Sequence, residues 1–205
     1  MEFSRLNERQ LDALREVSNV GMGNAATALS QLTGKTIQLN VPRAAVLETA
    51  RMAEFLGGAE RVAVGIYLRM LGNARGNILM IFPRQNAAKI LEALVPRNTG
   101  GGETLTELEL SALKEVGNIL ASAYLNALGE MLRMPLIPSV PCLTIDTVGT
   151  VIDHALADFG EVGGTTLVLD TEFFSAGERV NSEFFLLPAP SSLETILTAL
   201  GIGMQ

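Results

Sequence analysis

The chain has 205 residues, nearly half of them apolar, and a formal net charge of −7 at neutral pH. That length and apolar content allow a domain with a sizeable core. The acidic balance and the absence of Trp argue against a nucleic-acid partner. The single cysteine, Cys142, excludes an internal disulfide and a cysteine-based metal cage.

The first predicted element is a long amphipathic helix over residues 7–32. Asn7 is its expected N-cap, because Gln10 follows three residues later as in a capping box. At about 100° per residue, the apolar side chains gather on one face, which is expected to be buried: Leu11, Leu14, Val17, Ala25, Ala28, Leu29 and Leu32. The opposite face carries small and polar side chains and is expected to face solvent: Asp12, Glu16, Asn19, Gly23, Thr27 and Ser30.

Strand-like runs rich in Val, Ile and Leu follow at residues 36–46, 61–70 and 77–83. An apolar-periodic helix is expected at residues 86–94. Residues 96–102 then include three successive glycines, which predict a joint between two parts of the chain.

The same order of elements recurs after this joint. Thr106 is followed three residues later by Glu109, which predicts a second capping box and a second long helix. Strands are expected at residues 143–151, 165–174 and 182–188, and a last helix at residues 191–200.

The two long helices also match residue by residue. An offset of 99 residues lays Asp12–Asn19 over Ser111–Asn118, Asn7 over Thr106, and Val41-Pro42 over Val140-Pro141. Several landmarks at one offset indicate an internal duplication, with repeats at residues 1–98 and 103–205 and a Gly-rich linker at residues 99–102. We therefore expect a single α/β (α+β) domain over residues 1–205. Its two halves are expected to be pseudo-symmetric, with long helices packed on a largely antiparallel sheet.

The chemically suggestive part of the repeat is a Glu-x-x-Asn pair, Glu16 with Asn19 and Glu115 with Asn118. Side chains three residues apart are neighbours on a helix surface. Asn is a poor residue in a helix interior, so its presence in both copies favours a function. A carboxamide can hold a water in line with an electrophile, and a nearby carboxylate can bind a Lys or Arg of a partner. The pair is therefore interpreted as half of an active site that a partner completes.

The full pattern is Asp or Ser, three residues, Glu, two residues, Asn, then 22 residues and Pro. It occurs twice, as Asp12, Glu16, Asn19, Pro42 and as Ser111, Glu115, Asn118, Pro141. In this spacing and in its two-copy layout the chain resembles the CheC family of chemotaxis phosphatases, which is related to CheX and FliY. Intact pairs in both copies favour CheC over CheX.

This resemblance implies hydrolysis of the aspartyl phosphate on the response regulator CheY. Asn19 and Asn118 would each align the attacking water, while Glu16 and Glu115 would pair with the regulator's active-site lysine. The chain would carry no metal or cofactor of its own, because the Mg²⁺ would belong to phosphorylated CheY. The resemblance also implies binding to the receptor deamidase CheD, which we place in the second half near Asp146.

Two interpretations without catalysis stay open. The chain would be a binding module that sequesters CheD or phosphorylated CheY, or a flagellar-motor or receptor-array component that only captures phosphorylated CheY. Faster phosphate decay distinguishes the enzyme from both. Gly21 and Gly23 each cost about 1 kcal/mol relative to Ala in a helix interior, so the second pair is expected to be the more rigid and the stronger site.

Other features have structural interpretations. Gly21-x-Gly23-x-x-Ala26 has the spelling of a dinucleotide-binding fingerprint, but it lies within a helix and not after a strand. His154, the only histidine, is expected to be structural or on the surface, and Cys142 is expected to be a small buried hydrophobic residue. Met1–Leu11 is polar, and no apolar run approaches the roughly 20 residues that cross a bilayer. These features predict a cytoplasmic protein without membrane insertion.

Overall fold

The computed structural model describes residues 6–94, 105–157, 164–175 and 178–201. The predicted linker at residues 99–102 lies outside these ranges. The first part of the chain forms α1 (Glu8–Thr33), β1 (Ile37–Glu48), the short 3-10 helix η2 (Thr49–Arg51), α2 (Met52–Phe55), β2 (Val62–Gly72), β3 (Gly76–Pro83) and α3 (Arg84–Leu94). The second part forms α4 (Glu107–Leu132), β4 (Leu136–Pro138), β5 (Cys142–Thr147), α5 (Val148–Leu156), β6 (Thr165–Ser175), β7 (Glu178–Pro188) and α6 (Pro190–Ala199).

Both long helices begin where their capping boxes predict. The Asn7 side chain accepts a hydrogen bond from the Gln10 N–H, and the Gln10 side chain accepts one from the Asn7 N–H. Thr106 and Glu109 exchange the equivalent pair of hydrogen bonds at the start of α4. Such reciprocal bonds satisfy two backbone donors that a helix start otherwise leaves unpaired.

One sheet joins the two parts of the chain. Its strand order is β1-β6-β7-β3-β2-β4, with β5 also paired to β2. Every pairing among the described strands is antiparallel, as predicted. The first long strand of each part pairs with a strand of the other part, β1 with β6 and β5 with β2. Each part therefore completes its sheet only with strands from the other.

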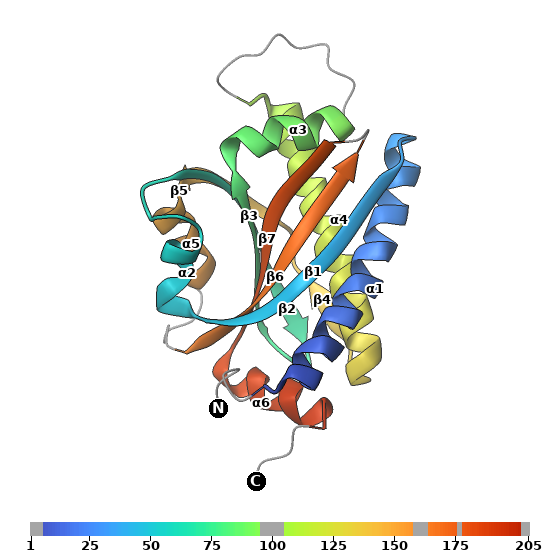
Figure 1. The fold of residues 1–205 in the computed structure, drawn as a ribbon, viewed down its shortest axis with the longest axis vertical. Coiled ribbons are helices and arrows are strands. Elements are labelled where there is room, and N and C mark those ends of the chain that lie inside the picture. Colours follow the sequence, from blue (N-terminus) through green and yellow to red (C-terminus); the bar gives the residue numbers. More distant parts are fainter. Residues whose placement is uncertain (1–5, 95–104, 158–163, 176–177, 202–205) are drawn as a thin grey trace.

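Helices cover both faces of this sheet (Figure 1). The larger core lies under α1 and α4, and α3 and α6 close its two ends. A smaller core lies on the opposite face under α2 and α5. Successive residues of a strand point to opposite faces: Phe184 of β7 enters the larger core and Phe185 enters the smaller one. The mixed α/β class expected from the sequence is confirmed.

The predicted strand at residues 143–151 is wrong in its second half. The strand ends at Thr147, which becomes the N-cap of α5, its hydroxyl accepting a hydrogen bond from the Thr150 N–H. The buried residues of α5 follow the spacing i, i+3, i+4, i+7, which is typical of a helix: Val148, Val151, Ile152 and Ala155. Their apolar, β-branched composition favoured a strand, but the spacing is the better signal here.

Shorter features also depart from expectation. Cys142 is exposed rather than buried, because it begins β5 at an edge of the sheet. The four-residue α2 and the three-residue β4 are too short to show a periodic pattern in the sequence. His154 is exposed near the end of α5. In the part of the chain that is described, no helix combines the length and apolar character needed to cross a membrane.

The buried face of α1 is rotated from its predicted position, because this helix packs against α4 as well as against the sheet. Ala28 and Leu32 are exposed, whereas Ser18, Gly21 and Met22 are buried. A Cβ on Gly21 would lie only 2.9 Å from Cα of Tyr124. Glycine at this position therefore permits close helix packing, which is a structural role and not a nucleotide-binding one.

Candidate functional site

The two Glu-x-x-Asn pairs lie on neighbouring helices. Helices α1 and α4 pack side by side and run in opposite directions (Figure 1). Each pair lies in the first half of its helix, Glu16 with Asn19 on α1 and Glu115 with Asn118 on α4. Because the helices are antiparallel, the two pairs are directed toward opposite ends of the helix pair. They form two separate sites.

Both side chains of the first pair are engaged within the molecule. The Asn19 carboxamide accepts a hydrogen bond from the Val41 N–H (2.9 Å) and donates one to the Val41 carbonyl (3.3 Å). The Glu16 carboxylate lies 3.8 Å from the Arg15 guanidinium, which also lies 3.2 Å from Asp12. Glu16 is exposed, but Asn19 is only partly exposed. The first pair is thus less available than the predicted solvent-facing stripe suggested.

The backbone of β1 explains this hydrogen bonding. Its register with β6 shifts between Asn40 and Arg43, so Val41 and Pro42 fall outside the ladder. A backbone N–H and carbonyl in a folded protein need partners, and Asn19 provides both. Val41 is a neighbour of the site that the sequence interpretation missed, although its repeated Val-Pro context was a signal.

The second pair is free. Within the described residues, no hydrogen bond or ion pair engages the side chain of Glu115 or of Asn118. Val140, at the position equivalent to Val41, is 84% exposed, whereas Val41 is 1% exposed. Ser139, the preceding residue, is held by β2, since its N–H donates to the Arg69 carbonyl and its hydroxyl accepts from the Arg69 N–H.

Of the other residues predicted for the site, Asp12 and Ser111 lie on the two long helices, and Asp146 lies on a separate surface. Asp12 and Ser111 are exposed one turn before Glu16 and Glu115, on the same helix faces. Asp146 is exposed on β5, and its carboxylate accepts a hydrogen bond from the Thr147 N–H at 2.6 Å. Since it leads directly into α5, it lies apart from both pairs.

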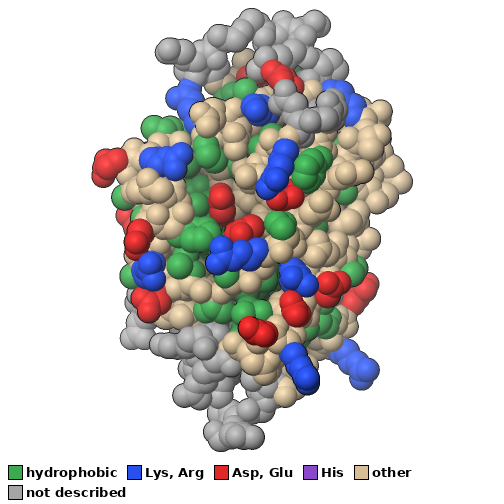
Figure 2. Space-filling view, viewed as in Figure 1, with side chains coloured by type: hydrophobic (Ala, Val, Ile, Leu, Met, Phe, Trp, Pro, Cys, Tyr) green, Lys and Arg blue, Asp and Glu red, His purple; other side chains and the backbone are tan. Residues whose placement is uncertain are grey.

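The acidic and histidine side chains are dispersed. In the described ranges, no three His, Cys, Asp or Glu side chains gather closely enough to hold a metal ion. Nδ1 of His154 lies 3.4 Å from the Thr144 hydroxyl. On the face of the molecule shown in Figure 2, acidic and basic side chains are interspersed, without a field of one sign. A ligand of high charge is therefore not indicated on that face.

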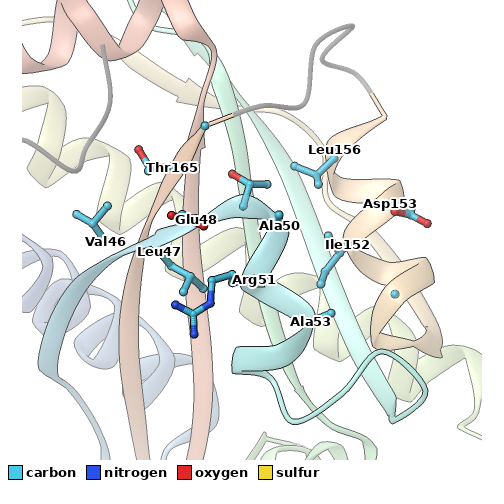
Figure 3. Close-up of a pocket in the computed structure, with 13 residues that line it drawn as sticks. Val46, Leu47, Glu48, Ala50, Arg51, Ala53, Ile152, Asp153, Leu156 and Thr165 are labelled. Carbon is cyan, nitrogen blue, oxygen red and sulfur yellow. The ribbon is translucent and has the colours of Figure 1, made fainter.

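A cavity of about 840 Å³ lies away from both pairs (Figure 3). Its walls come from the end of β1, the start of β6, and the helices α2 and α5. Apolar side chains such as Leu47 and Ile152 line it beside Glu48 and Arg51, and Arg51 is also paired with Glu54. No residue of the Glu-x-x-Asn pattern contributes to this cavity, so its size does not make it the predicted site.

Comparison with known proteins identifies matches along the whole chain. The model of the CheC-like family matches residues 10–45 and 108–145, the two segments that contain the repeated pattern. The chain is 36% identical to the CheY-P phosphatase CheC of Bacillus subtilis, with 98% of this chain and 99% of the relative covered. It is 22% identical to the flagellar motor switch phosphatase FliY of the same organism, covering 97% of this chain and 51% of that relative.

The fold is also similar to solved structures. The crystal structure of Thermotoga maritima FliY matches with a TM-score of 0.77 at 18% identity, covering 96% of this chain and 98% of that one. The middle domain of FliM from H. pylori matches with a TM-score of 0.66 at 12% identity, covering 95% of this chain and 99% of that one. At these identities the likeness concerns the fold alone.

Proposed function

Because the chain belongs to the CheC-like family, we propose that it is a phosphatase that hydrolyses the aspartyl phosphate of the response regulator CheY. The full-length similarity to a CheY-P phosphatase supports the reaction. At the level of residues, the proposal is carried by the Glu115–Asn118 pair on α4, whose side chains make no hydrogen bond or ion pair within the described residues. Glu115 is exposed and Asn118 is partly exposed.

In this mechanism Asn118 enters the phosphorylation site of the regulator. Its carboxamide oxygen accepts a hydrogen bond from a water and holds the water oxygen in line with the phosphorus. The water oxygen bonds to phosphorus, the bond from phosphorus to the aspartyl oxygen breaks, and the regulator's carboxylate and inorganic phosphate are released. The water's proton passes to the phosphate or the solvent, and Asn118 is chemically unchanged.

Glu115 has a docking role in the same proposal. Its carboxylate pairs with the active-site lysine of the regulator, which fixes the register of α4 on the partner. Magnesium requires several oxygen ligands in octahedral geometry, and one carboxylate beside one carboxamide does not supply them. We therefore assign the Mg²⁺ to the regulator, where it would neutralise charge on the phosphoryl group.

The second site is proposed to carry most of the activity. Before Asn19 could orient a water, it would have to give up both hydrogen bonds to Val41. At about 1 kcal/mol for each hydrogen bond, this cost lowers the rate at the first site by roughly tenfold or more. Asn118 has no such cost within the described structure.

The test follows the decay of phosphorylated CheY with wild-type protein, Asn19→Ala, Asn118→Ala and the double variant. Asn118→Ala is expected to lose most of the activity, Asn19→Ala a minor part, and the double variant all of it. Asn19→Ala is a matched control, since it makes the same chemical change at the equivalent helix position. Decay at the wild-type rate with the double variant would rule out the catalytic role.

Binding to CheD is a second part of the proposal, with Asp146 as a contact. Its support is the exposure of this carboxylate on β5, a surface apart from both Glu-x-x-Asn pairs. Asp146→Lys is expected to weaken CheD binding in a titration and to leave phosphate decay unchanged. Wild-type CheD affinity in this variant would remove Asp146 from the interface. The double Asn variant should keep full CheD affinity, because the two surfaces are separate.

A further inference from the structure

Two large apolar side chains are exposed near the second Glu-x-x-Asn pair. Leu108, in the first turn of α4, is 68% exposed. It precedes Glu115 by seven residues, which is close to two helical turns, so both lie on one stripe roughly 10 Å apart along the axis. Val140, in the segment between β4 and β5, is 84% exposed.

The contacts of neighbouring residues place the segment that contains Val140 close to α4. β4, which ends two residues before it, packs against α4. Cys142, two residues after it, lies opposite Tyr67 of β2 in the sheet. The neighbouring strand residue Ile66 lies directly beneath Gly117 of α4, where a Cβ would be 2.6 Å from its side chain. Val140 thus lies in the segment that connects β4, which packs on α4, to β5, whose partner strand β2 lies beneath Gly117.

The first site has no exposed apolar side chain at either of the two equivalent positions. The residue equivalent to Leu108 is Arg9, which is exposed and charged. The residue equivalent to Val140 is Val41, which is 1% exposed and bonded to Asn19. The copy of the pair that is free therefore has exposed apolar side chains at both of these positions. Beside the engaged copy, the exposed apolar side chain is Val20, next to Asn19 and 58% exposed.

The polar pair alone offers few contacts to a folded partner. Exposed ion pairs contribute little net affinity, whereas burial of apolar side chains is the main favourable term in most protein association. We propose that Leu108 and Val140 form the apolar docking surface for the response regulator at the second site. This inference rests on the proposed function and names residues that determine affinity rather than chemistry.

Its partner surface would be an apolar rim around the regulator's phosphorylation site, beside the lysine that Glu115 contacts. Docking there buries Leu108 and Val140 on the same surface as the Glu115–Asn118 pair, which excludes water from the contact. Substitution of Leu108 or Val140 should therefore raise the KM for the phosphorylated regulator and leave kcat unchanged.

The test measures phosphate decay against regulator concentration for Leu108→Ser, Val140→Ser and the double variant. We expect KM to rise about tenfold for each single variant and further for the double, with kcat unchanged. Leu108→Met should retain the wild-type KM. Val20→Ser and Val62→Ser are matched controls, since these residues are 58% and 50% exposed away from the second pair and should leave KM unchanged.

A wild-type KM in the double serine variant, or a loss of kcat without a change in KM, would overturn the inference. If Asn118→Ala still abolished turnover in that case, the proposed function would stand without this docking surface. Direct titration with regulator that carries beryllofluoride in place of the phosphoryl group distinguishes the docking surface from the catalytic role. Weaker binding by the double serine variant would support the surface even if the chain proved not to be catalytic, and unchanged binding would overturn it.

Discussion

Asn19 binds both backbone groups of Val41, whereas Asn118, at the equivalent position of the second long helix, makes no hydrogen bond to Val140. The Val140 carbonyl instead accepts a hydrogen bond from the Ser139 hydroxyl. The difference arises in the strands and not in the helices. β1 continues past the irregularity at Val41 as one strand, while the second part is interrupted between β4 and β5 at Val140. The Asn of the pattern therefore has a structural role in the first copy, whereas in the second copy its carboxamide is available to a partner.

This difference predicts unequal effects on stability. Asn19→Ala leaves the Val41 N–H and carbonyl without their partner, so the free energy of unfolding should fall by about 1–3 kcal/mol. Asn118→Ala removes no hydrogen bond within the described residues and should change it by less than about 0.5 kcal/mol. Urea unfolding of both variants measures the difference. Equal losses of stability would mean that the Asn19–Val41 bonds contribute nothing specific.

The glycines of α1 provide a second pair of contrasting substitutions. A Cβ on Gly21 would lie 2.9 Å from Cα of Tyr124 and 3.1 Å from the Ala123 carbonyl oxygen, both backbone atoms of α4. Gly21→Ala should therefore destabilise the protein by about 1–3 kcal/mol through overpacking. A Cβ on Gly23 meets nothing within 4 Å, so Gly23→Ala should stabilise it by up to about 1 kcal/mol.

Thermal unfolding of the two alanine variants tests this contrast, because each makes the same chemical change two residues apart in one helix. The melting temperature should fall for Gly21→Ala and rise for Gly23→Ala. A rise in both would show that α1 and α4 can separate slightly without cost.

Local patterns predicted much of the fold. The capping boxes at Asn7 and Thr106 mark the helix starts because they satisfy the backbone locally, and the long strands follow from β-branched composition. The boundary at Thr147 was missed because apolar residues such as Val151 suit both strands and helices. No local pattern indicates that β1 pairs with β6 of the other part, since pairing depends on the whole sheet.

The candidate site was predictable to a similar extent. Helical spacing places Glu16 beside Asn19, and the repeat identifies the second pair. That Asn19 is bonded to Val41 depends on an irregularity in a strand 22 residues later, which spacing within the helix cannot reveal. The exposure of Val140 has the same origin, because it depends on how β2 holds Ser139.

The raised pKa of Glu183 predicts that the stability of the protein depends on pH. It lies opposite Asp170 in the pairing of β6 with β7. Burial, and then the negative charge of Asp170, raise the pKa of Glu183 from its ordinary value of 4.5 to about 7, against the opposing effects of its own backbone and Arg61. The folded protein therefore binds this proton more tightly than the unfolded chain does. The associated stability is fully present below pH 4.5 and is lost as the pH rises through about 7.

Glu183→Gln removes this titration. Relative to the wild type, the variant should gain on the order of 2 kcal/mol in the free energy of unfolding between about pH 4.5 and pH 8. Urea unfolding at several pH values in this window measures the gain. Parallel curves for the two proteins would show that Glu183 does not titrate differently in the folded state. Burial also raises the pKa of Asp170, so part of the dependence should persist in the variant.

The last prediction concerns salt and follows from the proposed role of Glu115. An exposed carboxylate that attracts a lysine of the regulator is screened by salt, with a Debye length near 10 Å at 0.1 M and about 3 Å at 1 M. The KM for phosphorylated CheY should therefore rise as salt is added to the wild-type protein. Glu115→Gln should raise KM at low salt and make it nearly independent of salt, because the amide keeps the shape and loses the charge.

Glu16→Gln is the matched control for this measurement. Glu16 already lies 3.8 Å from Arg15, and its neighbour Asn19 is bonded to Val41, so the first site should contribute little to the measured KM. The variant should keep the salt dependence of the wild type. If Glu16→Gln removed that dependence and Glu115→Gln did not, the regulator would dock at α1, and the working site would be the pair whose Asn is bonded to β1. If both variants kept the salt dependence of the wild type, the charge attraction would lie outside both Glu-x-x-Asn pairs.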